Sequence, residues 1–467
     1  MASLTAPPSL RNPTNPFSAS ADSQTRTAAE QALVQALTFT TPPLKLYTRA
    51  SPSFPSLCRL FNAQLTPSPL LIARPQTTAQ TSAVLLAARA TATPLAVRAG
   101  GHDVWGRAAG MPDGLTLDLR ELDGITLSAD QKSAAVGGGV TSRHLVAFLE
   151  GHGLATAAGA EGGVGWTGWA LWGGYGPAAA FTGLGVDVML GATVVLGDGR
   201  VVEAEGDSEL LWGVRGAGPA LGVVVETRVR VVPMGRILAG FVRFAWGEVE
   251  GVLMGLQEVL DRGVPEAFCV QVRARLTAGE PDLGVSFCWP DGDFVEGRRW
   301  LEVVRGLGTV VSDNVAETTF SAFQAFLSVP APQVNVVSRG PAISRFTPAA
   351  VAAIKDGVDR IPPTRPYLFF AHIAHGKAVQ PNPGSCFATR KPHILFHVSA
   401  MNKHEPEMMG EAIEWADGFV DGLKATGEVL PPVYAAFMGN DEAVDESYGE
   451  NWERLKALRR EVDGGGC

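Results

Sequence analysis

Strict alternation of apolar and polar residues predicts a β-strand from Val223 to Pro233, in the run VVVETRVRVVP. One face carries Val225, Thr227, Val229 and Val231, and the other carries Glu226, Arg228 and Arg230. Shorter strand-like runs begin at Leu95, Leu115, Gly124 and Lys132. Helical runs cover Ala79–Thr91 and the segment that starts at Thr141 and ends at glycines. From about Leu70 to Pro233, this pattern predicts one α+β domain with a mixed sheet.

After Pro233 the pattern changes to strand-like runs separated by helical ones. The strand-like runs are FVRFAW, CVQVRARL, GVSFCW, YLFFAHIAH and HILFHVS. One helix is marked by Thr347 as its N-cap and Pro348 at its first position, and a last helix begins near Glu450. This predicts a second domain, an antiparallel sheet covered by helices on one face. We expect a flexible arm over 1–40, a first domain over 41–235, a second over 236–429, and a C-terminal segment over 430–467 that returns to the first.

Composition is that of a folded protein with an acidic balance. The chain has 467 residues, 46% of them hydrophobic and 18% charged, and its formal charge is −9. A disordered chain would be poorer in apolar groups. A net-negative protein with scattered basic residues is not attracted to nucleic acid or to an anionic membrane, so we predict neither as a partner.

Three further features bear on the cellular context. The five cysteines are odd in number, widely spaced and without a CxxC motif, which favours reduced thiols over disulfides or a zinc site. The uncharged stretch from Gly162 to Val186 is too rich in glycine, and interrupted by Pro177, to span a membrane. The N-terminus lacks the continuous apolar run of a secretory signal, so an intracellular, cytoplasmic location is expected. The pattern does not indicate an oligomeric state.

Chemistry concentrates in three glycine-rich segments. They are VRAGGHDVWGRA from Val97, GAEGGVGWTGWALWGGYG from Gly159, and LLWGVRGAGPALGVVVE from Leu210. Two glycines in a tight turn let consecutive N–H groups face one anion, and glycines also permit close approach to a flat ligand. Taken singly, each segment is also compatible with a glycine turn between core elements.

Together and in this order, the three segments resemble the flavin-linked oxidases of the vanillyl-alcohol-oxidase superfamily, in its berberine-bridge-enzyme-like branch with a PCMH-type FAD-binding domain. The resemblance implies FAD as cofactor and an oxidoreductase activity. In that family the RxGGH motif holds the pyrophosphate and its histidine bonds to the flavin 8α-methyl. Carried over, the pyrophosphate loop is Arg98, Ala99, Gly100, Gly101, His102 and Asp103, with His102 as the covalent anchor. The other implied cofactor contacts are Val164, Gly165, Gly168, Gly173, Gly174 and Tyr175 at the isoalloxazine and ribityl, Gly222 and Val224 on the adenine or ribityl side, and Asn451.

The sequence departs from the family at the second anchor and at the base. Many relatives carry a second flavin-linked residue, a cysteine, where this chain has Glu161. We therefore expect a single covalent bond through His102, or non-covalent FAD. The family's tyrosine base is replaced in SYGEN by Ser447, with Tyr448 next to it. Serine at neutral pH cannot abstract a proton unaided.

Candidates for the missing base are Tyr448, Glu161 and three histidines, since histidine has a suitable unperturbed pKa. His372 and His375 are three residues apart, so on a strand they point to opposite faces and only one can face the flavin. His397 is placed to lie on a neighbouring strand. Each of these histidines could instead be a satisfied core or surface residue. No carboxylate pattern accompanies them, so no metal site is predicted.

The resulting hypothesis is an FAD-dependent oxidase. It transfers a hydride from a small, largely apolar natural-product intermediate to flavin N5, and O₂ reoxidises the flavin. The first alternative is a non-redox cyclase or isomerase of Diels–Alderase type on the same FAD-binding fold, which the missing tyrosine base favours. The second is a catalytically inactive protein that holds FAD or another ligand.

Overall fold

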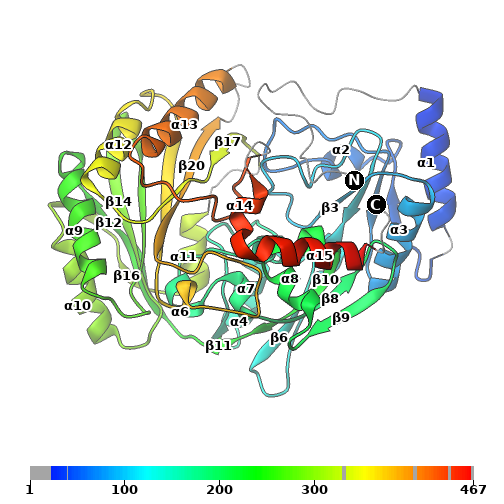
Figure 1. Ribbon diagram of the computed structural model, residues 1–467, viewed down its shortest axis with the longest axis horizontal. Coiled ribbons are helices and arrows are strands. Elements are labelled where there is room, and N and C mark those ends of the chain that lie inside the picture. The colour runs from blue at the N-terminus through cyan, green and yellow to red at the C-terminus, as the bar shows by residue number, and fades with distance from the viewer. Residues whose placement is uncertain (1–22, 39, 329–332, 403–407, 440–442, 464–467) are drawn as a thin grey trace.

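The computed structural model describes residues 23–463, apart from 39, 329–332, 403–407 and 440–442. The structure confirms an α+β architecture, with two halves that share no sheet (Figure 1). Among the described residues, no helix is long and apolar enough to cross a membrane. The cytoplasmic location and the domain boundaries stay predictions.

The N-terminal half contains two main sheets where the sequence predicts one. A mixed sheet has the order β1-β2-β4-β3, in which β4 runs parallel to β2 and β3. An antiparallel sheet has the order β5-β6-β10-β8-β9, and β7 pairs with β11. The bounds are β1 Lys45–Tyr47, β2 Leu71–Arg74, β3 Leu95–Arg98, β4 Leu115–Asp118, β5 Ile125–Leu127, β6 Ser133–Gly137, β7 Leu154–Ala155, β8 Met189–Val195, β9 Val201–Glu205, β10 Val223–Arg230 and β11 Val232–Pro233. The alternation predicted from Val223 is confirmed, because buried and exposed residues alternate along β10 from Val225.

Short helices connect these strands. Their bounds are α1 Ser23–Leu37, α2 Phe54–Leu57, α3 Thr78–Ala90, η1 Leu119–Glu121, α4 Ser142–Glu150, α5 Trp166–Ala170, α6 Ala179–Thr182, α7 Gly185–Val188, α8 Glu209–Ala217 and η2 Gly218–Ala220. Over residues 23–37 the prediction of a flexible arm is wrong. Leu33 and Leu37 of α1 are buried in one apolar cluster with α3, which gives this segment a packed position.

The C-terminal half is an antiparallel sheet with helices on its outer face, as predicted (Figure 1). The strand order is β15-β12-β14-β13-β19-β20-β17, with β16 on β12 and β18 on β20. The strands are β12 Ile237–Phe244, β13 Cys269–Thr277, β14 Glu280–Trp289, β15 Val310–Asp313, β16 Ala316–Thr318, β17 Asn335–Arg339, β18 Ala342–Ile343, β19 Tyr367–Ala374 and β20 His393–Asn402. The helices are η3 Trp246–Glu248, α9 Val249–Asp261, α10 Phe294–Arg305, α11 Phe320–Leu327, α12 Pro348–Asp359, η4 Gly376–Val379 and α13 Met409–Lys424. The predicted cap is confirmed: the Thr347 hydroxyl accepts the N–H of Ala350.

The last segment packs against the N-terminal half. It consists of α14 Val444–Tyr448, η6 Gly449–Asn451 and α15 Trp452–Val462. Leu455 and Leu458 of α15 share an apolar cluster with Leu211 of α8, and Gly213 lies directly beneath Leu458.

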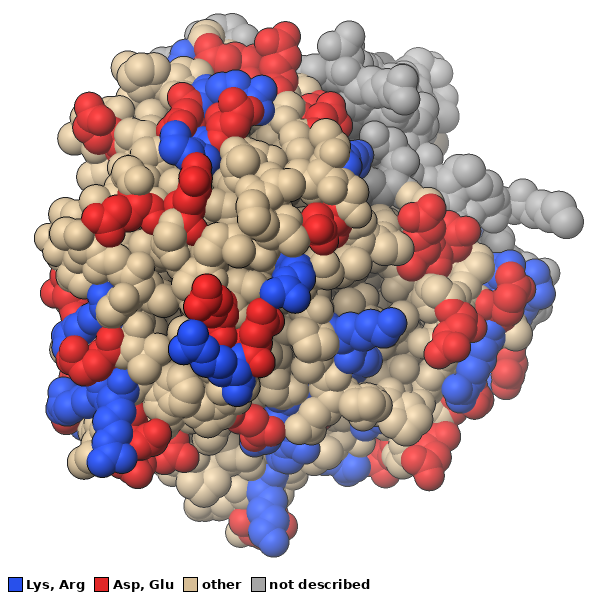
Figure 2. Space-filling view, turned by 60° about the vertical axis from the view of Figure 1, so that its left-hand side comes forward, with Lys and Arg blue, Asp and Glu red and all other residues tan. Residues whose placement is uncertain are grey.

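Acidic and basic side chains are interspersed over the face formed by the outer helices (Figure 2). Several pair one helical turn apart, including Arg262 with Glu258 on α9 and Lys355 with Asp359 on α12. Pairing of this kind produces a mixed surface without a single-sign field on this face.

Candidate functional site

The loop after β3 crosses the loop before α5 with the two backbones in contact. A Cβ built on Gly100 would lie 2.3 Å from the nitrogen of Gly165, and Gly101 has φ of +73°. Any larger residue at position 100 would separate the loops, and position 101 favours glycine. The sequence therefore needs glycine here for a geometric reason.

The backbone of this loop presents unused hydrogen-bond donors. Within the described part of the chain, the N–H groups of residues 100–103 donate to no other residue. The loop is instead held through a carbonyl group, because Phe61 donates its N–H to the carbonyl of Gly101. Consecutive free N–H groups at glycines form an anion-binding concavity, which fits a diphosphate.

His102 lies at the junction of the two loops. Its ring stacks on Phe61 with centroids 4.6 Å apart, and its Nε2 lies 2.7 Å from where a Cβ on Gly163 would be. Burial lowers the pKa of His102, while the neighbouring Glu161 carboxylate acts in the opposite direction. The imidazole is therefore neutral at neutral pH, with a nitrogen lone pair available for bond formation. Glu161 itself accepts the N–H of Gly163 at 3.0 Å.

Arg98 supports the loop from below through a buried charge network. Its guanidinium donates to Asp118 at 2.9 Å, and these side chains are 2% and 0% exposed. Arg120 binds the same carboxylate at 2.5 Å. Burial alone would raise the pKa of Asp118, but its bonds to Arg120 and Arg98 prevail and lower it. Arg98 thus joins β3 to β4, a role for which its place in the RxGGH motif gave no signal.

Removing this carboxylate is expected to destabilise the fold. Asp118→Asn leaves buried arginine charges without a counter-ion, and we expect the free energy of unfolding to fall by about 3–5 kcal/mol. Urea unfolding followed by circular dichroism measures it. The control is Asp198→Asn, which breaks the exposed pair with Arg200 and should leave the free energy of unfolding nearly unchanged. Equal losses in the two variants would contradict the assignment.

The tryptophan-rich segment is mostly core. Trp166 donates its indole N–H to Ala157 and Trp169 donates to Tyr175, and both rings are buried. In contrast, nothing lies within 4 Å of a Cβ built on Gly168, and Val164 is half-buried. Gly173 and Gly174 have positive φ, and Gly173 lies against the ring of Phe387. The cofactor contacts predicted for this segment remain predictions.

The third glycine segment holds the two halves together through backbone carbonyls. Helix α8 is kinked at Arg215 and Gly216, and Arg215 donates to the carbonyls of Met189 and Gly384. The hydroxyl of Tyr448 donates to the carbonyl of Gly216 at 2.9 Å. Asn451 donates to the carbonyl of Cys386 at 3.1 Å. Through these contacts, Tyr448 supports the backbone at the kink of α8 and Asn451 supports the backbone at Cys386.

On the adenine or ribityl side, the two predicted residues lie at the start of β10. Gly222 has φ of +157° and lies against Val194 and Val195 of β8, while Val224 is 3% exposed. The close approach at Gly222 leaves no room for a side chain. Their predicted cofactor contacts are backbone contacts, which this packing allows.

Histidines gather on the inner face of the C-terminal sheet. His372 of β19 is opposite Gln271 of β13, and its Nδ1 accepts the Gln271 amide at 2.8 Å. His393 and His397 lie on β20, four residues apart and therefore on the same face. His397 stacks on Phe437 with centroids 4.4 Å apart. The predicted neighbouring-strand position of His397 is confirmed, since Phe370 of β19 is opposite it.

A cavity lies where this face meets the loop of residues 175–180. Tyr175, Gln271 and His372 are among the residues that line it. The hydroxyl of Tyr175 and Nε2 of His393 are 2.8 Å apart, and Nδ1 of His393 is 2.7 Å from the carbonyl of Lys391. Because a carbonyl only accepts, Nδ1 carries the proton and Nε2 accepts the Tyr175 hydroxyl. His375 does not line this cavity; it donates to the carbonyl of Phe268 at 2.9 Å.

The buried histidines make stability sensitive to acid. Burial lowers the pKa of His372 to about 3 and that of His393 to about 4, from 6.5. Between pH 6.5 and 4 the unfolded chain binds more protons, so the free energy of unfolding falls as pH decreases, by up to about 1.4 kcal/mol per pH unit for each histidine. Urea unfolding at pH 7, 6 and 5 measures this slope. We expect His393→Gln to flatten it and the exposed His144→Gln to leave it unchanged; an unaltered slope in His393→Gln would contradict the prediction.

Comparison with known proteins places this geometry in a family. A family model described as an FAD binding domain matches residues 69–205. The FAD-linked oxidoreductase aurO of Gibberella zeae is 46% identical over 468 aligned residues, which cover 99% of this chain and 91% of that protein. The chain belongs to the FAD-linked oxidoreductases of the berberine-bridge-enzyme-like family.

Solved structures agree with this assignment. 6-Hydroxy-D-nicotine oxidase from Arthrobacter nicotinovorans superposes with a TM-score of 0.82 at 25% identity, covering 90% of this chain and 95% of that one. Glucooligosaccharide oxidase from Acremonium strictum, which carries a 6-S-cysteinyl, 8α-N1-histidyl FAD, has the same fold, with a TM-score of 0.80 at 19% identity over 93% and 97% of the two chains. These relatives are named as oxidoreductases or oxidases, so the cyclase alternative gains no support.

Two features of this FAD-linked oxidoreductase fit FAD. The free N–H groups of residues 100–103 suit its pyrophosphate, and a Cβ built on Gly168 would have open space around it. Sequence reasoning missed His393 and assigned Tyr175 to the cofactor alone. The available signal was the run HILFHVS, whose two histidines share one face of a strand.

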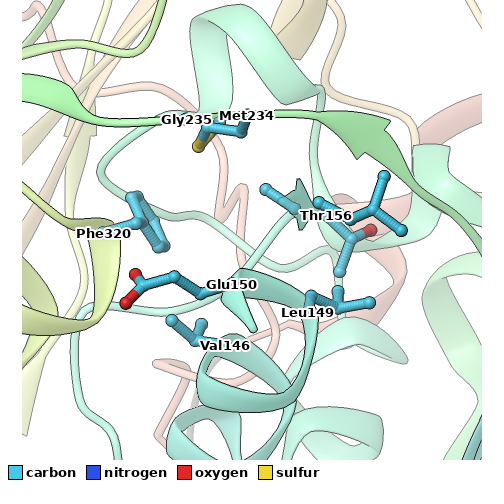
Figure 3. A pocket seen from close by; sticks show the side chains of 9 residues that line it. Val146, Leu149, Glu150, Thr156, Met234, Gly235 and Phe320 are labelled. Atoms are coloured by element: carbon cyan, nitrogen blue, oxygen red, sulfur yellow. The ribbon is translucent and has the colours of Figure 1, made fainter. Parts of the chain in front are cut away.

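A second pocket of the oxidoreductase contains none of the predicted site residues. It lies between α4, β7 and α11 and is lined mainly by apolar side chains (Figure 3). Its single acidic residue, Glu150, accepts both the N–H and the hydroxyl of Ser321 at the start of α11. The carboxylate is thus engaged in holding α11.

Proposed function

We propose that this enzyme is an oxidase that removes a hydride from a C–H bond of a small, largely apolar natural-product intermediate and passes the electrons to O₂. The observation that carries this proposal is the cavity in which Tyr175 and His372 meet, with His393 directly behind the Tyr175 hydroxyl. In this cavity two groups that can exchange protons, Tyr175 and His372, lie at the glycine-rich segment that the family resemblance assigns to the flavin. The relatives named as oxidases support the O₂ acceptor.

Bound FAD supplies the hydride acceptor and the site of reoxidation by O₂. This chain's own residues would hold it. The N–H groups of the loop from Gly100 to Asp103 would bind its pyrophosphate, and His102 would form a single covalent bond to its flavin ring. Glu161, at the position of the second anchor, has no thiol with which to form another.

Proton transfer is assigned to the Tyr175–His393 pair. A substrate hydroxyl at the cavity donates to the Tyr175 oxygen while the Tyr175 proton moves toward Nε2 of His393. The bond from Nδ1 to Lys391 keeps this imidazole in the tautomer that accepts. Burial raises the pKa of Tyr175 and lowers that of His393 to about 4, so both groups are neutral at rest and the proton moves only in concert with hydride removal. His372 is a second candidate from the same cavity.

Apolar side chains in the lining of the Tyr175 cavity support a largely apolar substrate. They include Ala179, Ala180 and Ala378. Apolar walls with a few convergent polar groups are typical of small-molecule sites.

The oxidase proposal is tested without knowing the substrate. The holoenzyme is reduced anaerobically with dithionite and mixed with air-saturated buffer, and flavin absorbance and hydrogen peroxide are recorded. We expect fast reoxidation with about one peroxide per flavin. Reoxidation no faster than that of free reduced FAD would overturn the proposed O₂ acceptor. Anaerobic bleaching by candidate substrates then tests the hydride step, and product formed without bleaching would favour the non-redox alternative.

A further inference from the structure

Strand β13 presents a row of polar side chains toward the N-terminal half. Gln271, Arg273 and Arg275 alternate along the strand with residues of the helix-covered core, Val270, Val272 and Ala274. The neighbouring Cys269 packs with residues of the N-terminal half, including Ala178 and Ala180. The row therefore lies on the same inner face as His372.

Arg273 is a half-buried cation that makes no hydrogen bond and no ion pair with any described residue. Its guanidinium carbon lies 4.2 Å from the centroid of the Phe241 ring. Gly284 lies opposite both Arg273 and Arg243 in the sheet, and a Cβ there would come 3.1 Å from the Phe241 ring. The missing side chain at position 284 makes room for this stack.

The carboxylate that acts electrostatically on Arg273 is Asp282, and it already binds other side chains. Asp282 binds Arg243 through both oxygens, at 2.7 and 2.6 Å, and also accepts the Thr277 hydroxyl. Burial and the neighbouring Arg275 lower the pKa of Arg273 to about 10, so it is still charged at neutral pH. Three arginines thus share one carboxylate, and Arg273 is the one that does not contact it.

Gln271 contributes an unused acceptor beside this cation. Its amide nitrogen donates to His372, while its Oε1 is buried and has no partner among the described residues. Gln271 is 2% exposed and lines the Tyr175 cavity. Two residues along a strand separate it from Arg273, a distance of about 7 Å. Phe370, opposite Arg273, lies edge-on to His372.

We propose that Arg273 binds an acidic oxygen of the substrate, a carboxylate or an ionised phenol, on an aromatic frame that packs against Phe241 and Phe370. The Gln271 Oε1 accepts a hydroxyl of the same molecule, which places that end at Tyr175. The proposal refines the substrate class of the proposed oxidase, but binding itself needs no redox step. Arginine suits this role because its planar guanidinium both stacks on an aromatic ring and binds a planar anion.

The test is calorimetric titration of the oxidised holoenzyme with two pairs of probes. Biphenyl-4-carboxylate is compared with biphenyl-4-carboxamide, and pentafluorophenolate with pentafluorobenzyl alcohol. We expect at least one anion to bind about 10- to 100-fold more tightly than its neutral partner, and the preferred pair identifies the acidic group. Arg273→Met should abolish that preference, and Arg273→Lys should retain only part of it. The matched control, Arg275→Met, removes an equal charge from the next position on the same face and should retain the preference.

Absence of any preference for the anions in the unmodified protein would overturn the proposal. So would equal losses in Arg273→Met and Arg275→Met, which would indicate a general effect of positive charge. Flavin content and near-ultraviolet circular dichroism verify that each variant is folded. If Arg273→Met does not fold, full preference in Arg273→Lys overturns the stacked, planar contact, and partial loss supports it. Because binding needs no turnover, the titration can be interpreted even if the oxidase proposal fails.

Discussion

Replacing His102 by alanine is expected to abolish covalent retention of the flavin. In the unmodified protein, yellow colour should stay with the acid-precipitated pellet, and the intact mass should exceed the chain mass by one FAD. In His102→Ala, colour should pass to the supernatant and the mass gain should disappear. The physical basis is the neutral, buried imidazole at the junction of the two glycine loops, next to Glu161. Non-covalent binding of FAD should persist in His102→Ala, because the N–H groups of residues 100–103 do not depend on the His102 side chain.

A second histidine of the N-terminal half provides the control. His152 is exposed and its ring contacts the carbonyl of Phe148, so His152→Ala should keep the covalent flavin. Acid-stable colour in His102→Ala would show that another residue forms the bond. Flavin released by acid from the unmodified protein would show that FAD is held without one, and His102 would then only position it.

Tyr175→Phe is expected to lower the rate of substrate-dependent flavin reduction by about 10²–10⁴-fold, the usual contribution of a positioned acid–base group. The substitution keeps the ring, which packs against Tyr434 and Phe387, and removes only the hydroxyl that His393 accepts. Flavin content and the flavin spectrum should be unchanged. Anaerobic stopped-flow reduction with a substrate that bleaches the unmodified enzyme measures the effect.

Tyr434→Phe serves as the matched control for Tyr175→Phe. The Tyr434 hydroxyl is directed to the carbonyl of Trp169 at 3.5 Å and contacts no histidine among the described residues. Its loss should change the reduction rate by less than about threefold, in line with one weak neutral hydrogen bond. A normal reduction rate in Tyr175→Phe would move the proton-transfer role to His372, which lines the same cavity.

Local features of the sequence predicted local structure well. The alternation after Val223 and the Thr347 cap depend on residues within one strand or one helical turn, so they could be read without knowing the fold. The same holds for the glycine loops, where Gly100 and Gly101 meet a steric demand that few other residues satisfy. The two sheets of the N-terminal half were not separable in this way, because strand pairing is decided by partners distant in the chain.

Two residues assigned by motif alone have other partners in the structure than the motif predicts. Arg98 was expected at the pyrophosphate, but its guanidinium pairs with Asp118, twenty positions later, in the protein interior. Tyr448 was a candidate base, but its hydroxyl lies on the carbonyl of Gly216. In both cases the motif identified a residue that matters to the site and left open which atoms it contacts, because a side chain's partner is chosen by packing.

By itself, the sequence indicated the two-half organisation through its strand and helix pattern, and the tight turn before His102 through residue types at neighbouring positions. The cofactor class followed from the resemblance of the three glycine segments, taken together, to a known family. The tertiary structure alone decided which groups meet at the cavity. Tyr175 and His393 are 218 positions apart, and Gln271 and His372 are 101 apart. The first hydrogen bond exists only because the inner face of the antiparallel sheet packs against the loop at Tyr175, and the second because β13 pairs with β19. No local pattern records that contact, since burial and geometry are properties of the folded chain.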